Sequence, residues 1–177
     1  MTNTRFNDLI LKYHIGHDYK TPAVFLSGAM TGLTPEEQKG WRNRIIEILG
    51  NEVVVYDPTC FDAESQNSQV QENGFNYDIS SIINSDMVIL NLNKCMTSVG
   101  TCQEIMLAWL LGIPIVGFWE NKEDIVPLHP WIEKELSLKF NNFEVLKFYL
   151  LKQFIFKIEK TELRLRHEGR MLQKTIK

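Results

Sequence analysis

The chain has 177 residues, of which 44% are hydrophobic and 23% charged, and its net charge is −3. This composition is that of a globular protein with one sizeable core, and the slight negative charge argues against polymeric nucleic acid as a partner. No apolar run reaches the ~18–20 residues of a membrane span, and no N-terminal stretch resembles a signal peptide. We therefore expect a soluble, cytoplasmic protein that does not bind membranes.

Cysteine and histidine usage argues against a metal site. The three cysteines are odd in number and have no CxxC spacing, which favours reduced thiols over disulfides or a zinc site. They are Cys60, Cys95 and Cys102. The four histidines are scattered along the sequence, so we expect no bound metal.

The first elements alternate strand and helix. Residues 1–20 predict an N-terminal arm or short helix, and the apolar run over 23–27 predicts a buried parallel strand. A Thr-Pro-Glu-Glu sequence opens a helix over 34–50, because it combines a capping residue, a proline at the first position and acids at the positive end of the helix dipole. A second strand follows over 53–56.

The same alternation continues through the middle of the chain. A polar stretch over 59–73 predicts a mobile surface loop, and a helix follows over 76–84. The third strand covers 87–92, a helix then runs to Leu111, and the fourth strand covers 115–119. Strands that alternate with helices predict a parallel sheet with right-handed crossovers.

The pattern changes near the C-terminus. Residues 129–132 predict a compact aromatic turn, 136–140 an edge strand, and a long helix starts at Phe143. Glutamates interrupt the basic end of this helix, which favours a packing helix over a nucleic-acid-binding tail. We expect an α/β fold: a doubly wound parallel sheet, flavodoxin- or Rossmann-like, with an added C-terminal helix.

These elements divide the chain into three parts. Residues 1–20 form the N-terminal arm, 21–140 the main domain and 141–177 the C-terminal helical extension.

The segment from Ser98 to Glu104 is the most informative part of the sequence. Gly100 has no Cβ, so the backbone there can approach a ligand closely. Thr101 and Glu104 have the spacing of a capping box, which is a purely structural interpretation. In the functional interpretation, Glu104 points into a cleft at the carboxyl end of the sheet, where α/β proteins bind ligands.

Other side chains are expected around the same cleft, because they follow strands or open a flanking helix. Asp57 follows the second strand, Asn91 ends the third, and Asp78 opens the helix before it. The candidate site residues are Ser27, Gly28, Met30, Asp57, Asp78, Asn91, Ser98, Gly100, Thr101 and Glu104.

This ordered set resembles the nucleoside 2-deoxyribosyltransferase superfamily, which includes 2′-deoxynucleoside 5′-phosphate N-hydrolases. The resemblance spans about residues 23–118, with His129-Pro130-Trp131 as an extension. Its pieces are Leu26-Ser27-Gly28-Ala29-Met30, Trp41-Arg42, Tyr56-Asp57-Pro58, Asp78-Ile79-Ser80-Ser81-Ile82, Ser85-Asp86, Ser98-Val99-Gly100-Thr101-Cys102-Gln103-Glu104, Ala108 and Gly112-Ile113-Pro114.

The resemblance implies an enzyme that cleaves the N-glycosidic bond of 2′-deoxynucleosides or their 5′-monophosphates. Glu104 would attack the anomeric carbon and form a covalent 2-deoxyribosyl ester, which a second base or water resolves. A carboxylate suits this chemistry, because cleavage builds oxocarbenium character at that carbon. Asp78 would contact or protonate the leaving base. The implied reaction needs no cofactor, and its partners are small molecules.

Two positions depart from the family pattern. Phe25 stands where the transferases have a tyrosine whose hydroxyl orients the nucleophile. Ser98 stands where they have an acid that contacts the base. Serine there resembles the N-hydrolase branch, in which it binds the 5′-phosphate, and a helix N-terminus suits an anion.

Three functions stay open on these residues. The first is the cleaving enzyme, by transfer or by hydrolysis. The second is a non-catalytic nucleotide-binding or sensing module on the same fold, because fold does not imply function. The third is another activity on a related scaffold, such as a ribonucleotide phosphoribohydrolase, although this chain lacks the dense glycine loop of those families.

The aromatic residues of the C-terminal half predict an assembly. Members of the resembling family complete each site with residues from a neighbouring subunit, drawn from the region after the fourth strand. We therefore expect a homodimer or higher even homo-oligomer, with residues 129–131 near the partner's cleft. The aromatic side chains are Trp131, Phe148, Phe154 and Phe156.

Overall fold

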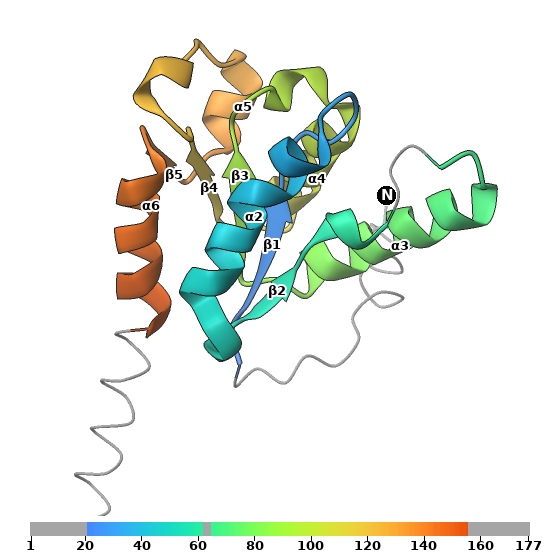
Figure 1. Ribbon diagram of the computed structural model, residues 1–177, viewed down its shortest axis with the longest axis horizontal. Helices are drawn as coiled ribbons and strands as arrows, with labels where there is room; N and C mark the ends of the chain where they lie inside the picture. The colour runs from blue at the N-terminus through green and yellow to red at the C-terminus, as the bar shows by residue number, and fades with distance from the viewer. Residues whose placement is uncertain (1–20, 62–64, 156–177) are drawn as a thin grey trace, which may run out of the picture.

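The computed structural model describes residues 21–61 and 65–155. The expected N-terminal arm over 1–20 and the expected helix beyond residue 155 lie outside these ranges. The described part forms one five-stranded parallel sheet with helices on both faces (Figure 1). The predicted α/β class and parallel sheet are therefore confirmed.

The strands follow the flavodoxin order β2-β1-β3-β4-β5. β1 and β3 are the central pair, with Ser27 opposite Leu90 at their carboxyl ends. The predicted edge strand is β5, and it pairs in parallel with β4. The strands are β1 (Ala23–Ser27), β2 (Val54–Tyr56), β3 (Met87–Asn91), β4 (Ile115–Phe118) and β5 (Leu138–Phe140).

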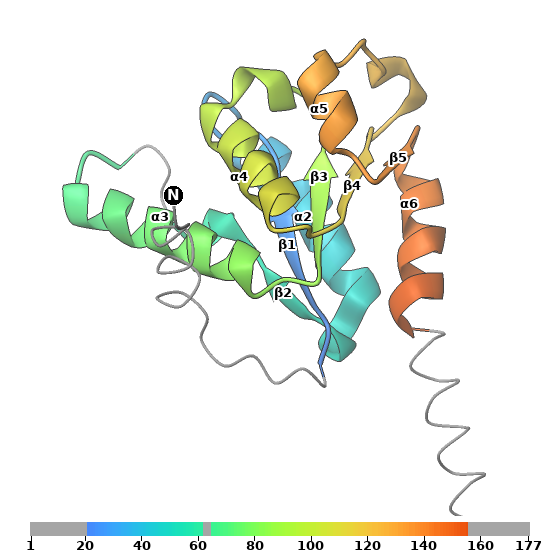
Figure 2. The same ribbon diagram turned by 180° about the vertical axis from the view of Figure 1, so that it is seen from behind.

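Two helical layers cover the sheet. α2 and α6 pack on one face, and α3, α4 and α5 on the other, as the two opposite views show (Figures 1 and 2). Each face has its own apolar core, because alternate residues of each strand point to opposite sides. The helices are α2 (Pro35–Leu49), α3 (Ser68–Ile83), α4 (Val99–Leu110), α5 (Pro130–Glu135) and α6 (Phe143–Leu150), which continues as a π-helical segment over Leu151–Ile155.

α2 begins where the sequence predicts. Thr34 caps it and forms a capping box with Glu37, and Pro35 occupies the first turn. The predicted aromatic turn over 129–132 is instead the start of a helix, because His129 caps α5 through a hydrogen bond from the backbone N–H of Trp131.

α3 is longer than predicted. It starts at Ser68, capped by Asn67, so the expectation of a loop over 59–73 is wrong for its last residues. The first half of α3 extends past the sheet, where no core imposes an apolar pattern (Figure 2). As a consequence, Asp78 lies in the second half of a long helix and does not open it.

Candidate active site

The site lies where β1 and β3 end side by side. The helix that follows β1 covers one face of the sheet and the helix that follows β3 covers the other. The two strand ends therefore form the switch point of the sheet, which is where α/β proteins of this topology bind ligands. Ser27 ends β1, and Glu104 lies on α4, which follows β3. The Ser27 hydroxyl donates a hydrogen bond to Glu104 Oε2 at 2.6 Å. The predicted nucleophile therefore lies at the predicted edge of the sheet.

Arg42, on α2, contacts the segments that follow β1 and β2. Its side chain is 0% exposed, and Nη2 donates to the carbonyl of Gly28 at 3.0 Å. Nη1 donates to the carbonyl of Gln38, and Nε lies 3.5 Å from Asp57 Oδ1. Burial lowers the pKa of Arg42 to about 10, whereas Asp57, Glu104 and Asp78 all raise it. Arg42 is thus a cation that several carboxylates share.

Asp78 and Glu104 form an unequal pair of carboxyl groups. Burial, and to a lesser extent the charge of Glu104, raises the pKa of Asp78 from 3.8 to about 7, while Arg42 opposes the change. The pKa of Glu104 is raised as well, because the effect of burial exceeds the lowering by the Ser27 hydrogen bond and by Arg42. Oδ1 of Asp78 is buried without a hydrogen-bond partner among the described residues. Such a pair suits a division into an ionised nucleophile and a protonated acid.

The amino end of α4 differs in detail from the prediction. Ser98, not Thr101, is the capping residue: its hydroxyl oxygen accepts from Thr101 N at 3.3 Å and from Thr101 Oγ1 at 2.9 Å. Thr101 is buried in the first turn. A Cβ at Gly100 would meet nothing within 4 Å, so the space beside this residue of the first turn is open.

The side-chain amide of Asn91 binds other residues of the protein. It is 4% exposed; Nδ2 donates to Glu120 Oε1 at 3.0 Å and Oδ1 accepts from Asn93 N at 2.9 Å. Arg44 binds the other oxygen of Glu120 at 2.8 Å. These contacts connect the loops after β3 and β4 with α2, so we leave Asn91 out of the proposed substrate contacts.

Gly28 and Met30 shape the loop after β1. A Cβ at Gly28 would lie 3.0 Å from the Trp41 ring and 3.2 Å from Asn91 Cβ, so a side chain at this position would have to displace its neighbours. The Met30 carbonyl accepts from Leu33 N and from Gln38 Nε2, both at 3.1 Å. The loop is therefore held by its own backbone contacts.

Asp57 begins the segment after β2. Its Oδ1 accepts from Thr59 N at 2.9 Å and faces Arg42. Beyond it, Cys60 and Tyr77 interact, and burial followed by the charge of Cys60 raises the pKa of Tyr77 to about 12. Asp57 thus lies between Arg42 and the pair formed by Cys60 and Tyr77.

Sequence reasoning found the carboxylates but gave no role to Arg42, Cys60 or Tyr77. A usable signal existed for Arg42. It stands three residues before Ile45 and seven before Leu49, and both are buried on the inner side of α2. An arginine at helical spacing on an apolar face needs buried partners, because an unpaired buried charge is costly.

The described residues contain no group of three or more His, Cys, Asp or Glu side chains that could hold a metal ion. The three cysteines are free thiols. Within residues 21–61 and 65–155, none of the helices has the length and apolar character to cross a membrane.

Strand order and the place of the carboxylates define a flavodoxin-like α/β protein with its candidate site at the switch point of the sheet. A family model described as nucleoside 2-deoxyribosyltransferase matches residues 24–166. The chain belongs to this family of glycosyl-transferring enzymes, and the match reaches further toward the C-terminus than the resemblance in the sequence indicated.

A solved structure shares the fold. A 2-deoxyribosyltransferase from Bacillus psychrosaccharolyticus is similar with a TM-score of 0.59 and 16% identity, over 71% of this chain and 90% of that one. A conserved protein from Enterococcus faecalis V583 is similar with a TM-score of 0.45 and 16% identity, over 76% of this chain and 88% of that one. A search of curated protein sequences found no match.

Proposed function

We propose that this protein cleaves the N-glycosidic bond of 2′-deoxynucleosides or their 5′-monophosphates through a covalent deoxyribosyl ester on Glu104. The observation that carries the proposal is the unequal pair at the switch point. Glu104 receives a 2.6 Å hydrogen bond from Ser27, and Asp78 beside it has a pKa raised to about 7. Family membership supports the class of reaction.

In the first half-reaction, an oxygen of Glu104 forms a bond to C1′ while the bond from C1′ to the base nitrogen breaks. The electron pair of that bond leaves with the base, and Asp78 supplies the proton that the base takes up. This proton matters because an anionic base is a poor leaving group. The Glu104 carboxylate also stabilises the positive charge that develops on the sugar in the transition state.

In the second half-reaction, water or a second base attacks C1′, and the ester bond to Glu104 breaks. The electron pair returns to the Glu104 carboxylate, and the ionised Asp78 accepts the proton of the incoming nucleophile. Water gives hydrolysis and a base gives transfer. Both products arise from the same pair of carboxyl groups.

The amino end of α4 supports binding of a 5′-phosphate. Ser98 accepts two hydrogen bonds from Thr101, which leaves its own O–H free to donate. The space beside Gly100 is open, and the helix dipole favours an anion there. We therefore include Ser98 and Gly100 in the phosphate contacts. Thr101 supports Ser98 instead, because its backbone N–H and its hydroxyl both donate to the Ser98 oxygen. The Gly28–Met30 loop and Asp57 are proposed to contact other parts of the substrate.

The test is a product assay. The protein is incubated with each deoxynucleoside and deoxynucleoside monophosphate, with and without a second base, and free base and exchanged nucleoside are separated by chromatography. We expect free base or exchange with the wild type, a loss of several orders of magnitude with Glu104→Gln, and a sugar-mass adduct on the Glu104 peptide with a 2-fluoro substrate. Binding without any product would identify a non-catalytic module.

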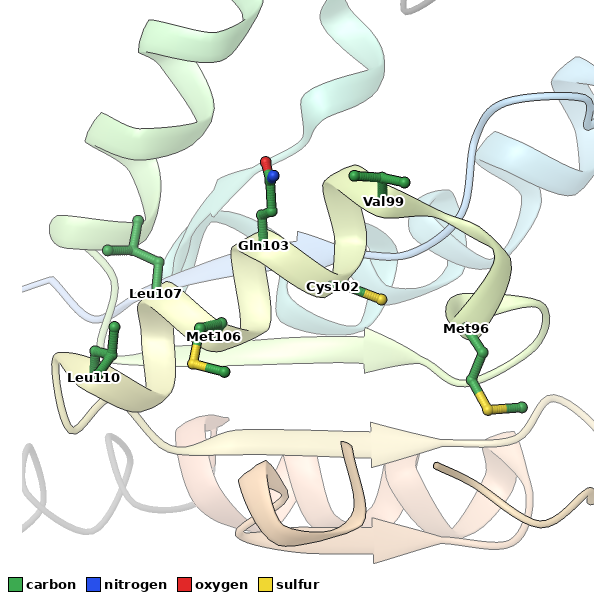
Figure 3. Close-up of a pocket in the computed structure, with 7 residues that line it drawn as sticks. All are labelled: Met96, Val99, Cys102, Gln103, Met106, Leu107 and Leu110. Carbon is green, nitrogen blue, oxygen red and sulfur yellow. The ribbon is translucent and has the colours of Figure 1, made fainter. Parts of the chain in front are cut away.

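We further propose that the protein assembles as a homodimer or higher even oligomer through the outer face of α4 and α5. An open apolar groove runs along this face (Figure 3). It is lined by Met96, Val99, Cys102, Gln103, Met106, Leu107 and Leu110. Trp131, 67% exposed, lines a second pocket that shares Met106 with the groove. Burying such a surface between subunits removes a solubility liability.

The aromatic surface that the sequence predicted for the C-terminal helix is smaller in the structure. Phe154 is buried in the chain's own core, whereas Phe148 is 65% exposed; Phe156 lies outside the described residues.

Light scattering at micromolar concentration tests the assembly. A mass of at least twice 20.6 kDa is expected, and Trp131→Glu should lower it more than the control Phe148→Glu. A fully active 20.6 kDa species would exclude a shared site. The cytoplasmic location stays a prediction.

A further inference from the structure

Ser27 is a buried residue at the end of a central strand. It ends β1, is 0% exposed, and pairs with β3 opposite Leu90. Its hydroxyl lies 2.6 Å from Glu104 Oε2, a length typical of a hydroxyl that donates to a charged carboxylate. The sheet therefore fixes the backbone that carries this donor.

β1 offers Glu104 no other polar side chain. Its sequence is Ala-Val-Phe-Leu-Ser, so Ser27 has its only hydroxyl. Phe25 shares the face of Ser27, because side chains alternate along a strand. Phe25 is fully buried in the same core cluster as Ile105, the residue after Glu104. On this side of β1, apolar packing and the single hydrogen bond thus both fix α4.

We propose that Ser27 is the positioning residue of Glu104: it holds Oε2 and leaves Oε1 to attack the substrate. This inference rests on the proposed function. Ser27 forms no covalent bond and gives up no proton; its O–H bond stays intact while Oε1 bonds to C1′ and the base departs. The expectation that Ser27 binds substrate is replaced by this role, because its one donor already has an acceptor.

The same bond favours the ionised form of Glu104. Burial opposes ionisation, and the charged or titratable groups that act on or near Glu104 are Arg42 on α2, Asp78 on α3 and Cys102 on α4 itself. Only Ser27 and Arg42 lower the pKa of Glu104. Without the Ser27 hydroxyl this pKa rises, so a larger share of the nucleophile is protonated at low pH. The acid limb of kcat/KM should then move to higher pH.

The experiment compares Ser27→Ala with Ser27→Thr, which keeps the hydroxyl. The matched control is Ser85→Ala, because Ser85 is also buried and its hydroxyl donates one hydrogen bond, to the Ser81 carbonyl at 2.7 Å. We expect Ser27→Ala to lower kcat/KM about 10- to 100-fold, the loss of one hydrogen bond to a charged group. The acid limb of the Ser27→Ala profile should move to higher pH. Ser27→Thr should restore kcat/KM and the position of the acid limb, and Ser85→Ala should change neither of them.

A second readout needs no substrate. Carbon NMR of glutamate-labelled protein follows the titration of the Glu104 carboxyl, which the Glu104→Gln spectrum assigns. A higher midpoint in Ser27→Ala supports the inference; an unchanged midpoint overturns it, as does an acid limb equal to that of the wild type. If the wild type cleaves no substrate, the proposed function fails instead, and the midpoint separates the two failures.

Discussion

The raised pKa of Asp78 sets the fraction of this residue that carries a proton at neutral pH. At the ordinary pKa of 3.8, fewer than about one aspartate in a thousand is protonated at pH 7, whereas at a pKa of about 7 about half are. The burial of Asp78 therefore increases the supply of acid about three orders of magnitude. Asp78→Asn removes the proton donor and keeps the shape of the side chain. We expect kcat/KM for natural substrates to fall about 10²- to 10⁴-fold.

The assay compares natural substrates with ones that carry an activated leaving group. The activated substrates need less protonation, so Asp78→Asn should affect them much less. With the wild type, kcat/KM for natural substrates should fall as the pH rises through about 7, because the acid loses its proton there; the variant should lack this limb. Asp86→Asn is the control, because Asp86 accepts a hydrogen bond from Ala23 N at 2.8 Å, at the opposite end of β1. Equal losses on both substrates would refute the role as acid.

Three further outcomes follow from the same contacts. In the folded protein Asp78 keeps its proton up to a pKa of about 7, whereas in the unfolded chain it loses the proton above its ordinary pKa of 3.8. The contribution of this proton to stability is therefore lost as the pH rises through about 7. Urea unfolding should show that Asp78→Asn is more stable relative to the wild type at pH 8 but not at pH 4. Arg42→Met should lower the free energy of unfolding by about 3–5 kcal/mol, because it removes a fully buried cation and leaves the partly buried carboxylates next to it without their counter-charge. A loss no larger than that of Arg44→Met, whose side chain is 46% exposed, would contradict this. Ser98→Asp keeps a good capping residue but repels a phosphate, so kcat/KM should fall more for monophosphates than for nucleosides; an unchanged ratio would exclude Ser98 from phosphate binding.

Most of the sheet was predictable because buried parallel strands leave a strong trace in the sequence. Apolar runs marked β1, β3 and β4, and the capping residue, the proline and the acids of the first turn marked α2. The start of α3 left no such trace. Its first turns project beyond the sheet, where Phe75 is 60% exposed, so no apolar period distinguishes them from a loop.

The candidate site was predictable only in part, for a related reason. Ser27 ends a strand and Glu104 follows one, and chain order alone places them at one edge of a parallel sheet. The position of Arg42 could not be derived in this way, because its long side chain reaches the loop after β1 from the inner face of α2. The capping residue of α4 was misassigned because Ser98 and Thr101 both fit the local pattern, and only the hydrogen bonds distinguish them.

The crowding around Gly28 has a consequence for which sequences the fold tolerates. Trp41 and Asn91 are both buried, so a methyl group at Gly28 forces well-packed neighbours apart by a few tenths of an ångström. In a library of random variants selected only for folding, substitutions at Gly28 should therefore be depleted, whereas those at Glu104 should survive. Selection for turnover should then remove the Glu104 variants as well. Variants that are lost under selection for folding mark residues that the fold requires, and variants that are lost only under selection for turnover mark residues that catalysis requires.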